Sequence, residues 1–194
     1  MRVIAGSARR LNLISPKGMS TRPTSDKVKE TLFNIIAPEL YDAEFLDLFA
    51  GSGAIGIEAL SRGAKHCTFV EKDKSATECI RKNLETTRFS EKATVLPYDV
   101  FTCIYNLHCK GGYDIIFMDP PYDKELEKAV LKSLSGLDIV TDDTMMIVEA
   151  SHMTDMSYVT ELGFEIQRVK QYKNNKHVFI KRRTDEKSYL SGEF

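Results

Sequence analysis

The chain has 194 residues and a formal net charge of −1; 42% of its residues are hydrophobic and 28% are charged. This length and composition predict a soluble protein with one main core. No apolar run approaches the roughly 18 residues that a helical membrane span needs, and the first residues lack the apolar stretch of a secretory signal, so we expect a cytoplasmic protein without a membrane partner.

The first elements of the chain are predicted to form a short arm. Residues 2–5 and 11–14 have the pattern of a small hairpin, and a helix follows them. Thr24 or Ser25 is the expected N-cap of this helix, and Pro38 is its expected stop. The apolar residues of the helix recur at helical spacing, at Val28, Leu32, Ile35 and Ile36.

From residue 44 onward, predicted strands alternate with predicted helices. The strands are expected at 44–49, 66–71, 93–96, 113–118, 145–149, 164–168 and 177–181. The helices are expected at 54–63, 75–87, 101–107 and 124–135. This alternation predicts a Rossmann-like α/β fold with a mostly parallel, seven-stranded sheet and helices on both faces. We interpret 1–40 as an N-terminal arm, 41–183 as the main domain and 184–194 as a polar tail.

A glycine-rich turn follows the first strand of the main domain. Gly51-Ser52-Gly53-Ala54-Ile55-Gly56 matches the Gly-x-Gly-x-x-Gly fingerprint at a strand-to-helix junction, and Glu71 ends the next strand. Nicotinamide enzymes and methyltransferases both place an adenosine ribose against an acidic residue at this point. The turn and Glu71 therefore predict an adenosine-containing cofactor without identifying it.

Asp47 favours a cationic cofactor, because it lies only four positions before Gly51. A carboxylate there would repel the pyrophosphate of a dinucleotide but attract the ammonium and sulfonium groups of S-adenosylmethionine. Asp47 could instead be a structural carboxylate that bonds turn amides, and Asp99 could either reach the adenine or cap the helix at Phe101. The predicted cofactor residues are Asp47, Phe49, Gly51, Ser52, Gly53, Glu71, Lys72, Asp99 and Val100.

A second motif, Asp119-Pro120-Pro121-Tyr122, closes the predicted strand 113–118. The prolines restrict the backbone and leave the Asp119 carboxylate and the Pro120 carbonyl as hydrogen-bond acceptors. Two such acceptors could hold the N–H bonds of an exocyclic amino group on a base, so that its lone pair points at a methyl donor. Tyr122 offers a face on which the base could stack. These four residues are therefore the predicted catalytic turn for amino-group methylation.

Basic residues gather at both ends of the chain. Residues 1–31 carry seven Lys or Arg against two Asp or Glu, and residues 168–187 carry eight against two. Such runs usually form a solvated face of the protein, but they also suit binding to a phosphate backbone.

The four cysteines form no Cys-x-x-Cys pair, and the four histidines have no metal-ligand spacing. We therefore expect reduced thiols, a buried Cys67 and no metal.

These motifs together resemble the class I S-adenosylmethionine-dependent methyltransferases that act on amino groups. The arm, with Arg2-Val3-Ile4-Ala5-Gly6 and the stretch from Thr21 to Asn34, resembles the start of the RsmD-type bacterial 16S rRNA guanine-N2 methyltransferases. The resemblance implies methylation of N2 of guanine 966 in 16S rRNA or the small ribosomal subunit, with S-adenosylhomocysteine as the product. It also implies an arm that folds back over the cofactor or substrate pocket. The candidate RNA-binding residues are Arg9, Arg10, Arg22, Thr24 and Lys27.

Two departures and three alternatives accompany this resemblance. Lys27 and Lys29 stand where arginines are common in relatives, and the stretch 172–175 departs from an expected Tyr-Gly pattern. The catalytic turn does not distinguish guanine from adenine, so adenine-N6 methylation of DNA is one alternative. An NAD-dependent oxidoreductase, favoured by the glycine turn and Glu71 alone, is another. A non-catalytic RNA-binding module that uses the basic ends is the third.

Overall fold

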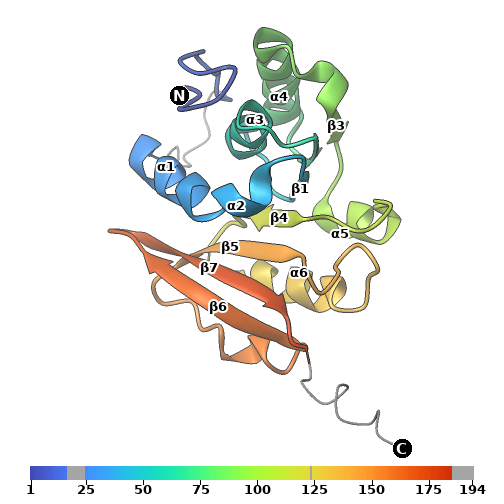
Figure 1. The fold of residues 1–194 in the computed structure, drawn as a ribbon. Helices are drawn as coiled ribbons and strands as arrows, with labels where there is room; N and C mark the ends of the chain where they lie inside the picture. Colours follow the sequence, from blue (N-terminus) through green and yellow to red (C-terminus); the bar gives the residue numbers. More distant parts are fainter. Residues whose placement is uncertain (17–24, 123, 185–194) are drawn as a thin grey trace, which may run out of the picture.

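The structure is a computed structural model that describes residues 1–16, 25–122 and 124–184 (Figure 1). Its described part contains one seven-stranded sheet with the order β3-β2-β1-β4-β5-β7-β6. The strands are β1 (Glu44–Asp47), β2 (His66–Val70), β3 (Ala93–Leu96), β4 (Ile115–Met118), β5 (Met145–Ser151), β6 (Phe164–Gln171) and β7 (Asn175–Arg182). β1 to β5 run parallel, and β7 is antiparallel to both β5 and β6, which confirms the prediction of a mostly parallel sheet.

The helices differ from the sequence-based prediction mainly at their ends. They are α1 (Asp26–Ile35), α2 (Ala37–Leu40), α3 (Ala54–Ser61), α4 (Lys74–Thr87), α5 (Val100–Cys103) and α6 (Leu126–Leu134), with 3₁₀ turns at Ser90–Lys92, Ile104–Asn106 and Ser157–Val159. The Ser25 hydroxyl caps α1 by accepting a hydrogen bond from the Val28 N–H. Pro38 does not end that helix; it lies in the first turn of α2, where a missing amide proton costs little. None of the described helices is long and apolar enough to cross a membrane.

Apolar side chains alternate between the two faces of the sheet. In β4, Ile115 and Phe117 belong to one core cluster, and Ile116 and Met118 belong to the other. The first cluster includes side chains of α1, α3, α4 and the arm, whereas α5 and α6 contribute to the second. Helices therefore cover both faces, as predicted, and the strand ends are left to form a site.

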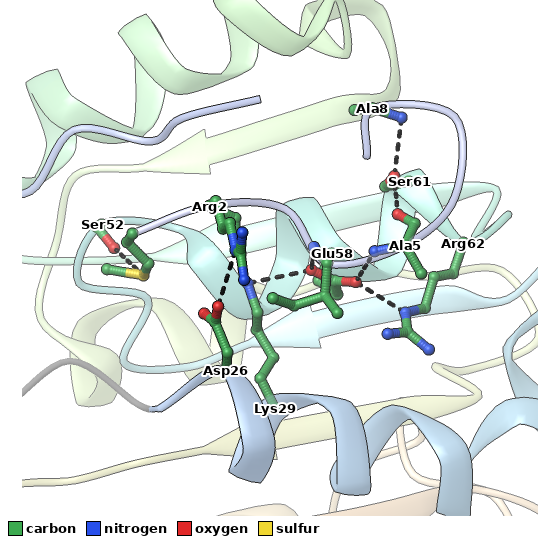
Figure 2. Close-up of polar contacts among 11 residues, drawn as sticks. Arg2, Ala5, Ala8, Asp26, Lys29, Ser52, Glu58, Ser61 and Arg62 are labelled. Atoms are coloured by element: carbon green, nitrogen blue, oxygen red, sulfur yellow. Dashed lines mark hydrogen bonds and ion pairs between the residues drawn. The ribbon is translucent and has the colours of Figure 1, made fainter. Parts of the chain in front are cut away.

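The predicted hairpin of the arm is reduced to one isolated antiparallel bridge, between Arg2 and Asn12. The amides of Ile4 and Ala5 donate to the Glu58 carboxylate of α3 at 2.8 and 2.9 Å instead of extending a strand ladder. The prediction of a hairpin was wrong over most of its length because a buried side chain more than fifty positions away accepts these hydrogen bonds. The arm is thereby attached to α3, as Figures 1 and 2 show.

Gly6 allows the arm to approach α3 closely. Its φ is +81°, and a Cβ at this position would lie 1.7 Å from the Ser61 carbonyl oxygen. The adjacent Ser7 N–H donates to that oxygen at 2.8 Å, and the Ser61 hydroxyl donates to the Ala5 carbonyl at 2.6 Å (Figure 2). Only glycine fits this backbone contact, which explains its place in the arm motif.

A buried ion cluster completes the attachment of the arm. Glu58 accepts from Lys29 at 3.1 Å and from Arg62 at 2.8 Å, and the Lys29 ammonium donates to the Arg2 carbonyl at 2.6 Å (Figure 2). Lys29 is 1% exposed and Glu58 is fully buried. Lys29 is therefore a buried structural cation, although it is one of the seven basic residues of the segment 1–31.

Candidate active site

Parallel strands bring the predicted acidic residues to one edge of the sheet. Asp47 is the last residue of β1, Glu71 follows β2 and Asp119 follows β4. Asp47 pairs in register with Phe69 of β2 on one side and with Phe117 of β4 on the other. The three side chains therefore meet at the carboxyl edge, where open α/β sheets bind ligands.

The glycine-rich turn has the geometry that the fingerprint predicts. Gly51 and Gly53 have positive φ angles, and Gly53 is the N-cap of α3. A Cβ on Gly56 would lie 2.4 Å from the Phe69 ring and 2.5 Å from the sulfur of Cys67, which is itself fully buried as expected. Gly56 thus lets α3 pack directly on β2, the role of the third glycine in such turns.

Glu71 and Asn83 hold this turn from two sides. One Glu71 carboxylate oxygen accepts from the Gly51 N–H at 2.8 Å. The buried Asn83 amide donates to the Ser52 carbonyl at 2.9 Å and also exchanges hydrogen bonds with the backbone of Ile14, at 2.8 and 3.0 Å. Asn83 therefore connects the glycine-rich turn directly to the arm.

Asp47 is a buried carboxyl group with an incomplete set of partners. It is 1% exposed, and its Oδ1 atom has no hydrogen-bond partner among the described residues. Burial raises its pKa from 3.8 to about 7; a backbone hydrogen bond from Gly56 opposes the rise, and the charge of Glu71 adds to it. Turn amides account for part of its bonding capacity, and Oδ1 remains available to a cation.

Asp99 caps the helix that follows it. One of its oxygens accepts from the Phe101 N–H at 3.0 Å, and the other accepts from the Lys72 ammonium at 3.3 Å. The Val100 side chain is buried in the second core cluster, and Phe49 packs against that cluster. The structure thus brings Lys72 to Asp99 and bears out the capping interpretation, which does not prevent Asp99 from facing a ligand.

The predicted catalytic turn stands at the end of β4. Asp119 is half-buried, Pro120 is buried, and Pro121 and Tyr122 are exposed. Burial raises the pKa of Asp119 well above its ordinary value, and the charges of Glu149 and then Asp47 raise it further. The protein surroundings therefore destabilise the ionised form of the Asp119 carboxyl. A bound cation would favour its ionisation.

The sequence analysis missed a cluster behind this turn. Glu149 of β5 is buried, and its carboxylate lies 3.4 Å from the Tyr122 hydroxyl and 3.0 Å from the His177 Nε2 atom. Asn175 also donates to it, and the Tyr172 hydroxyl lies 3.3 Å from the His177 Nδ1 atom. The signal that could have found Glu149 is an acidic residue near the end of an otherwise apolar parallel strand.

The candidate RNA-binding residues are divided by the structure. Arg9 and Arg10 are exposed on the arm, and Lys27 is exposed in the first turn of α1. Arg22 and Thr24 lie outside the described residues. Among the described residues, no group of three or more His, Cys, Asp or Glu side chains is arranged to hold a metal ion.

Comparisons with known proteins identify relatives of this chain. Residues 1–181 match the family described as Conserved hypothetical protein 95. The chain is similar to the ribosomal RNA small subunit methyltransferase D of Haemophilus influenzae, with 38% identity over 152 residues that cover 77% of this chain and 78% of the relative. The protein of the same name from Escherichia coli K12 is 37% identical over 151 residues, covering 77% of this chain and 74% of the relative.

A solved structure of the yhhF protein from Escherichia coli agrees with these relationships. It has a TM-score of 0.82 and 33% sequence identity, and the match covers 95% of this chain and 99% of that one. The strand order of the sheet and the glycine turn at its carboxyl edge fit the same architecture. The chain therefore belongs to the RsmD family, described as Conserved hypothetical protein 95, and has the Rossmann-like fold of the class I methyltransferases.

Proposed function

We propose that this protein transfers a methyl group from S-adenosylmethionine to the N2 amino group of a guanine in 16S rRNA. The observation that carries the proposal is the placement of the Asp119–Tyr122 turn beside the buried Asp47, at the carboxyl edge of the sheet. Two relatives named as small-subunit rRNA methyltransferases support a ribosomal RNA substrate. The family resemblance points to guanine 966.

The residues at the strand ends fit a cationic cofactor. S-adenosylmethionine, when bound, supplies a methyl group on a positively charged sulfur and carries an ammonium group. The Oδ1 atom of Asp47 is buried and has no partner among the described residues, so it has the capacity to accept from such an ammonium. Glu71 and Asp99 provide further carboxylates at the ends of β2 and β3, where the ribose and the adenine amino group would be recognised.

Asp119 and Pro120 have the chemistry to orient the target amino group. The Asp119 carboxylate and the Pro120 carbonyl would accept its two N–H bonds and direct the nitrogen lone pair at the methyl group. After transfer the nitrogen is acidic, and its proton passes to an Asp119 oxygen or to water. The raised pKa of Asp119 makes this carboxylate a stronger proton acceptor once it is ionised.

The anionic character of the site disfavours a nicotinamide dinucleotide. Asp47 lies just before the glycine-rich turn, where the pyrophosphate of a dinucleotide would meet like charge. An RNA strand would instead approach the exposed cations Arg9, Arg10 and Lys27, which lie on the arm and on α1. We accordingly propose small-subunit rRNA as the partner and the cytoplasm as the location.

Methylation assays with matched substrates test the proposal. The protein would be incubated with labelled S-adenosylmethionine and with protein-free 16S rRNA, assembled small subunits or duplex DNA, and the products would be digested to nucleosides for mass spectrometry. We expect N2-methylguanosine from an RNA substrate. Label found only as N6-methyladenine in DNA would overturn the choice of substrate, and binding of NAD without binding of S-adenosylhomocysteine would overturn the choice of cofactor.

One variant separates catalysis from mere RNA binding. We expect Asp119→Ala to abolish methyl transfer and to leave RNA binding largely intact, as judged by filter binding at a fixed salt concentration. An unchanged rate of transfer would exclude the role assigned to Asp119.

A further inference from the structure

Glu149 is a buried carboxylate of β5 that contacts three polar side chains. Its Oε1 atom is shared by the Tyr122 hydroxyl and the Asn175 amide, and its Oε2 atom faces the His177 ring. Glu149 and His177 are paired in the register of β5 and β7, so both side chains leave the same face of the sheet. The carboxylate is thus fixed by β7 on one side and faces the catalytic turn on the other.

The tip of the β6–β7 hairpin supplies most of this support. Tyr172 and Asn175 flank the tip, and the Tyr172 N–H donates to the Asn175 carbonyl at 2.8 Å. This is the stretch in which the sequence departs from the pattern expected for the family. Asn175, on one side of this tip, donates an amide hydrogen bond to Glu149, and Tyr172, on the other side, places its hydroxyl beside the ring of His177. In Figure 1 the tip extends to the side of the molecule where α1 begins.

The Tyr122 hydroxyl is contacted by the Asn175 side chain as well as by Glu149. The Tyr122 side chain is 42% exposed, so surrounding packing restricts its ring only weakly. Burial of the hydroxyl end, and then the carboxylates of Asp119 and Glu149, raise the pKa of this phenol above its ordinary value. The hydroxyl therefore stays protonated at neutral pH and remains a donor. Its 3.4 Å separation from Glu149 is long for a hydrogen bond, as is common for active-site contacts before the substrate binds.

We propose that Glu149 is a positioning residue: its carboxylate, fixed by His177 and Asn175, holds the Tyr122 hydroxyl and so sets the ring face on which the target base stacks. This inference rests on the proposed function for its catalytic consequence. Its structural part, the hold of Glu149 on Tyr122, is independent of any substrate. The hairpin tip thereby becomes part of the base-binding site.

The test compares Glu149→Gln with Glu161→Gln, the same chemical change at an exposed position. Protein labelled with [ζ-¹³C]tyrosine would report on the eight tyrosines by NMR, and loss of one signal in Tyr122→Phe would identify Tyr122. We expect Glu149→Gln to shift the Tyr122 signal and Glu161→Gln to leave it in place. An unmoved Tyr122 signal in a folded Glu149→Gln protein would overturn the proposal.

Kinetics on rRNA give the second measurement. We expect Glu149→Gln to lower kcat/KM for RNA by about 100-fold, the effect typical of a small misplacement in an active site. Its affinity for S-adenosylhomocysteine, measured by calorimetry, should equal that of the wild type, because Glu149 acts on the base and not on the cofactor. A wild-type kcat/KM in this variant would also overturn the proposal.

A milder variant guards against misfolding. Asn175→Ala removes one donor to Glu149 and a direct contact to the Tyr122 hydroxyl from a half-buried position on β7, and it leaves the carboxylate in place, so it is read together with Glu149→Gln. We expect the Tyr122 signal to shift in the same direction as in Glu149→Gln, with a smaller loss of activity. A Tyr122 signal that does not respond to Asn175→Ala in a protein with a wild-type melting temperature counts against the proposal.

Failure of the proposed function would be recognised separately. If the wild-type protein methylates no rRNA, the proposed function is wrong, and the NMR comparison still decides whether Glu149 holds Tyr122. If the wild type is active and Glu149→Gln behaves like Glu161→Gln in both measurements, only the positioning role is wrong.

Discussion

Two buried carboxyl groups, Glu58 of α3 and Asp47 of β1, differ in how many charged and polar partners surround them. Glu58 is fully buried and is met by two cations, Lys29 and Arg62, and by two backbone amides of the arm. Asp47 is 1% exposed, has an oxygen without a partner among the described residues, and has a pKa raised to about 7. The two residues are equally buried but differ completely in how their charge is compensated.

This is the difference expected between a structural charge and a charge proposed to bind a ligand. Burial of a carboxylate is costly unless hydrogen bonds and opposite charges compensate it. At Glu58 the protein supplies all of that compensation, and the carboxylate joins the arm to the domain. At Asp47 part of the compensation is missing, so a cationic ligand that supplies it would be bound strongly.

The largest effect is expected from Glu58→Ala. This change leaves Lys29 buried without a carboxylate and also removes the acceptor of the Ile4 and Ala5 amides. We expect the free energy of unfolding to fall by about 3–5 kcal/mol in urea titrations. Glu85→Ala, an exposed change in α4, should alter it by less than about 0.5 kcal/mol. Equal effects of the two changes would contradict a compensated cluster.

Asp47→Asn is expected to act in the opposite direction on stability. The folded state holds the Asp47 proton more tightly than the unfolded state, because the pKa rises from 3.8 to about 7. The wild type therefore loses stability as the pH rises through this interval, by up to about 4 kcal/mol above pH 7. We expect Asp47→Asn to be more stable than the wild type at about pH 8, with the difference vanishing near pH 4. Urea titrations at both pH values measure it.

Cofactor binding should show the same titration. A cationic ligand needs Asp47 ionised, so we expect the affinity for S-adenosylhomocysteine, which retains the ammonium group, to fall up to about tenfold for each pH unit below 7. Calorimetry over this range measures the dependence. In Asp47→Asn the affinity should be weak at every pH and the dependence should flatten. An equally steep dependence in this variant would show that another group controls binding.

The smallest effect is expected at Arg2 and Asp26. Their 2.8 Å ion pair joins the arm to α1, but the two side chains are 60% and 45% exposed (Figure 2). We expect Arg2→Ala to cost less than about 1 kcal/mol, and a double-mutant cycle with Asp26→Ala to give a coupling energy of similar size. A coupling as large as that of the buried cluster would mean that exposure does not govern these pairs.

Most of the fold was predictable because its signals are local. Strand and helix periodicities located the elements of the main domain to within a few residues, and β3 was predicted with its observed bounds. The absence of a full hairpin in the arm was not predictable. The amides of the arm donate to Glu58, more than fifty positions away, and nothing in the local sequence indicates this acceptor. The insertion of β7 between β5 and β6 likewise depends on long-range pairing.

The same division applies to the site. Asp47, Glu71 and Asp119 could be identified from sequence because each lies at the end of a predicted strand, and the carboxyl ends of parallel strands share one edge. Glu149 and His177 were missed because their contact depends on the register of an antiparallel pair that lies far apart in the chain. His177 was considered only as a metal ligand, and its observed partner is a carboxylate.

The position of β7 at the end of the described chain has a consequence for synthesis. The glycine turn, Asp47 and Glu71 all precede residue 72, so the residues proposed to bind the cofactor leave the ribosome early. Asn175 and His177, which contact Glu149, lie in β7 and emerge after the other described strands have been made. Because nascent chains become available from the N-terminus, a growing chain possesses its cofactor turn well before the support of Tyr122 exists. The proposed base-binding side is thus completed by β7, the last of the described strands.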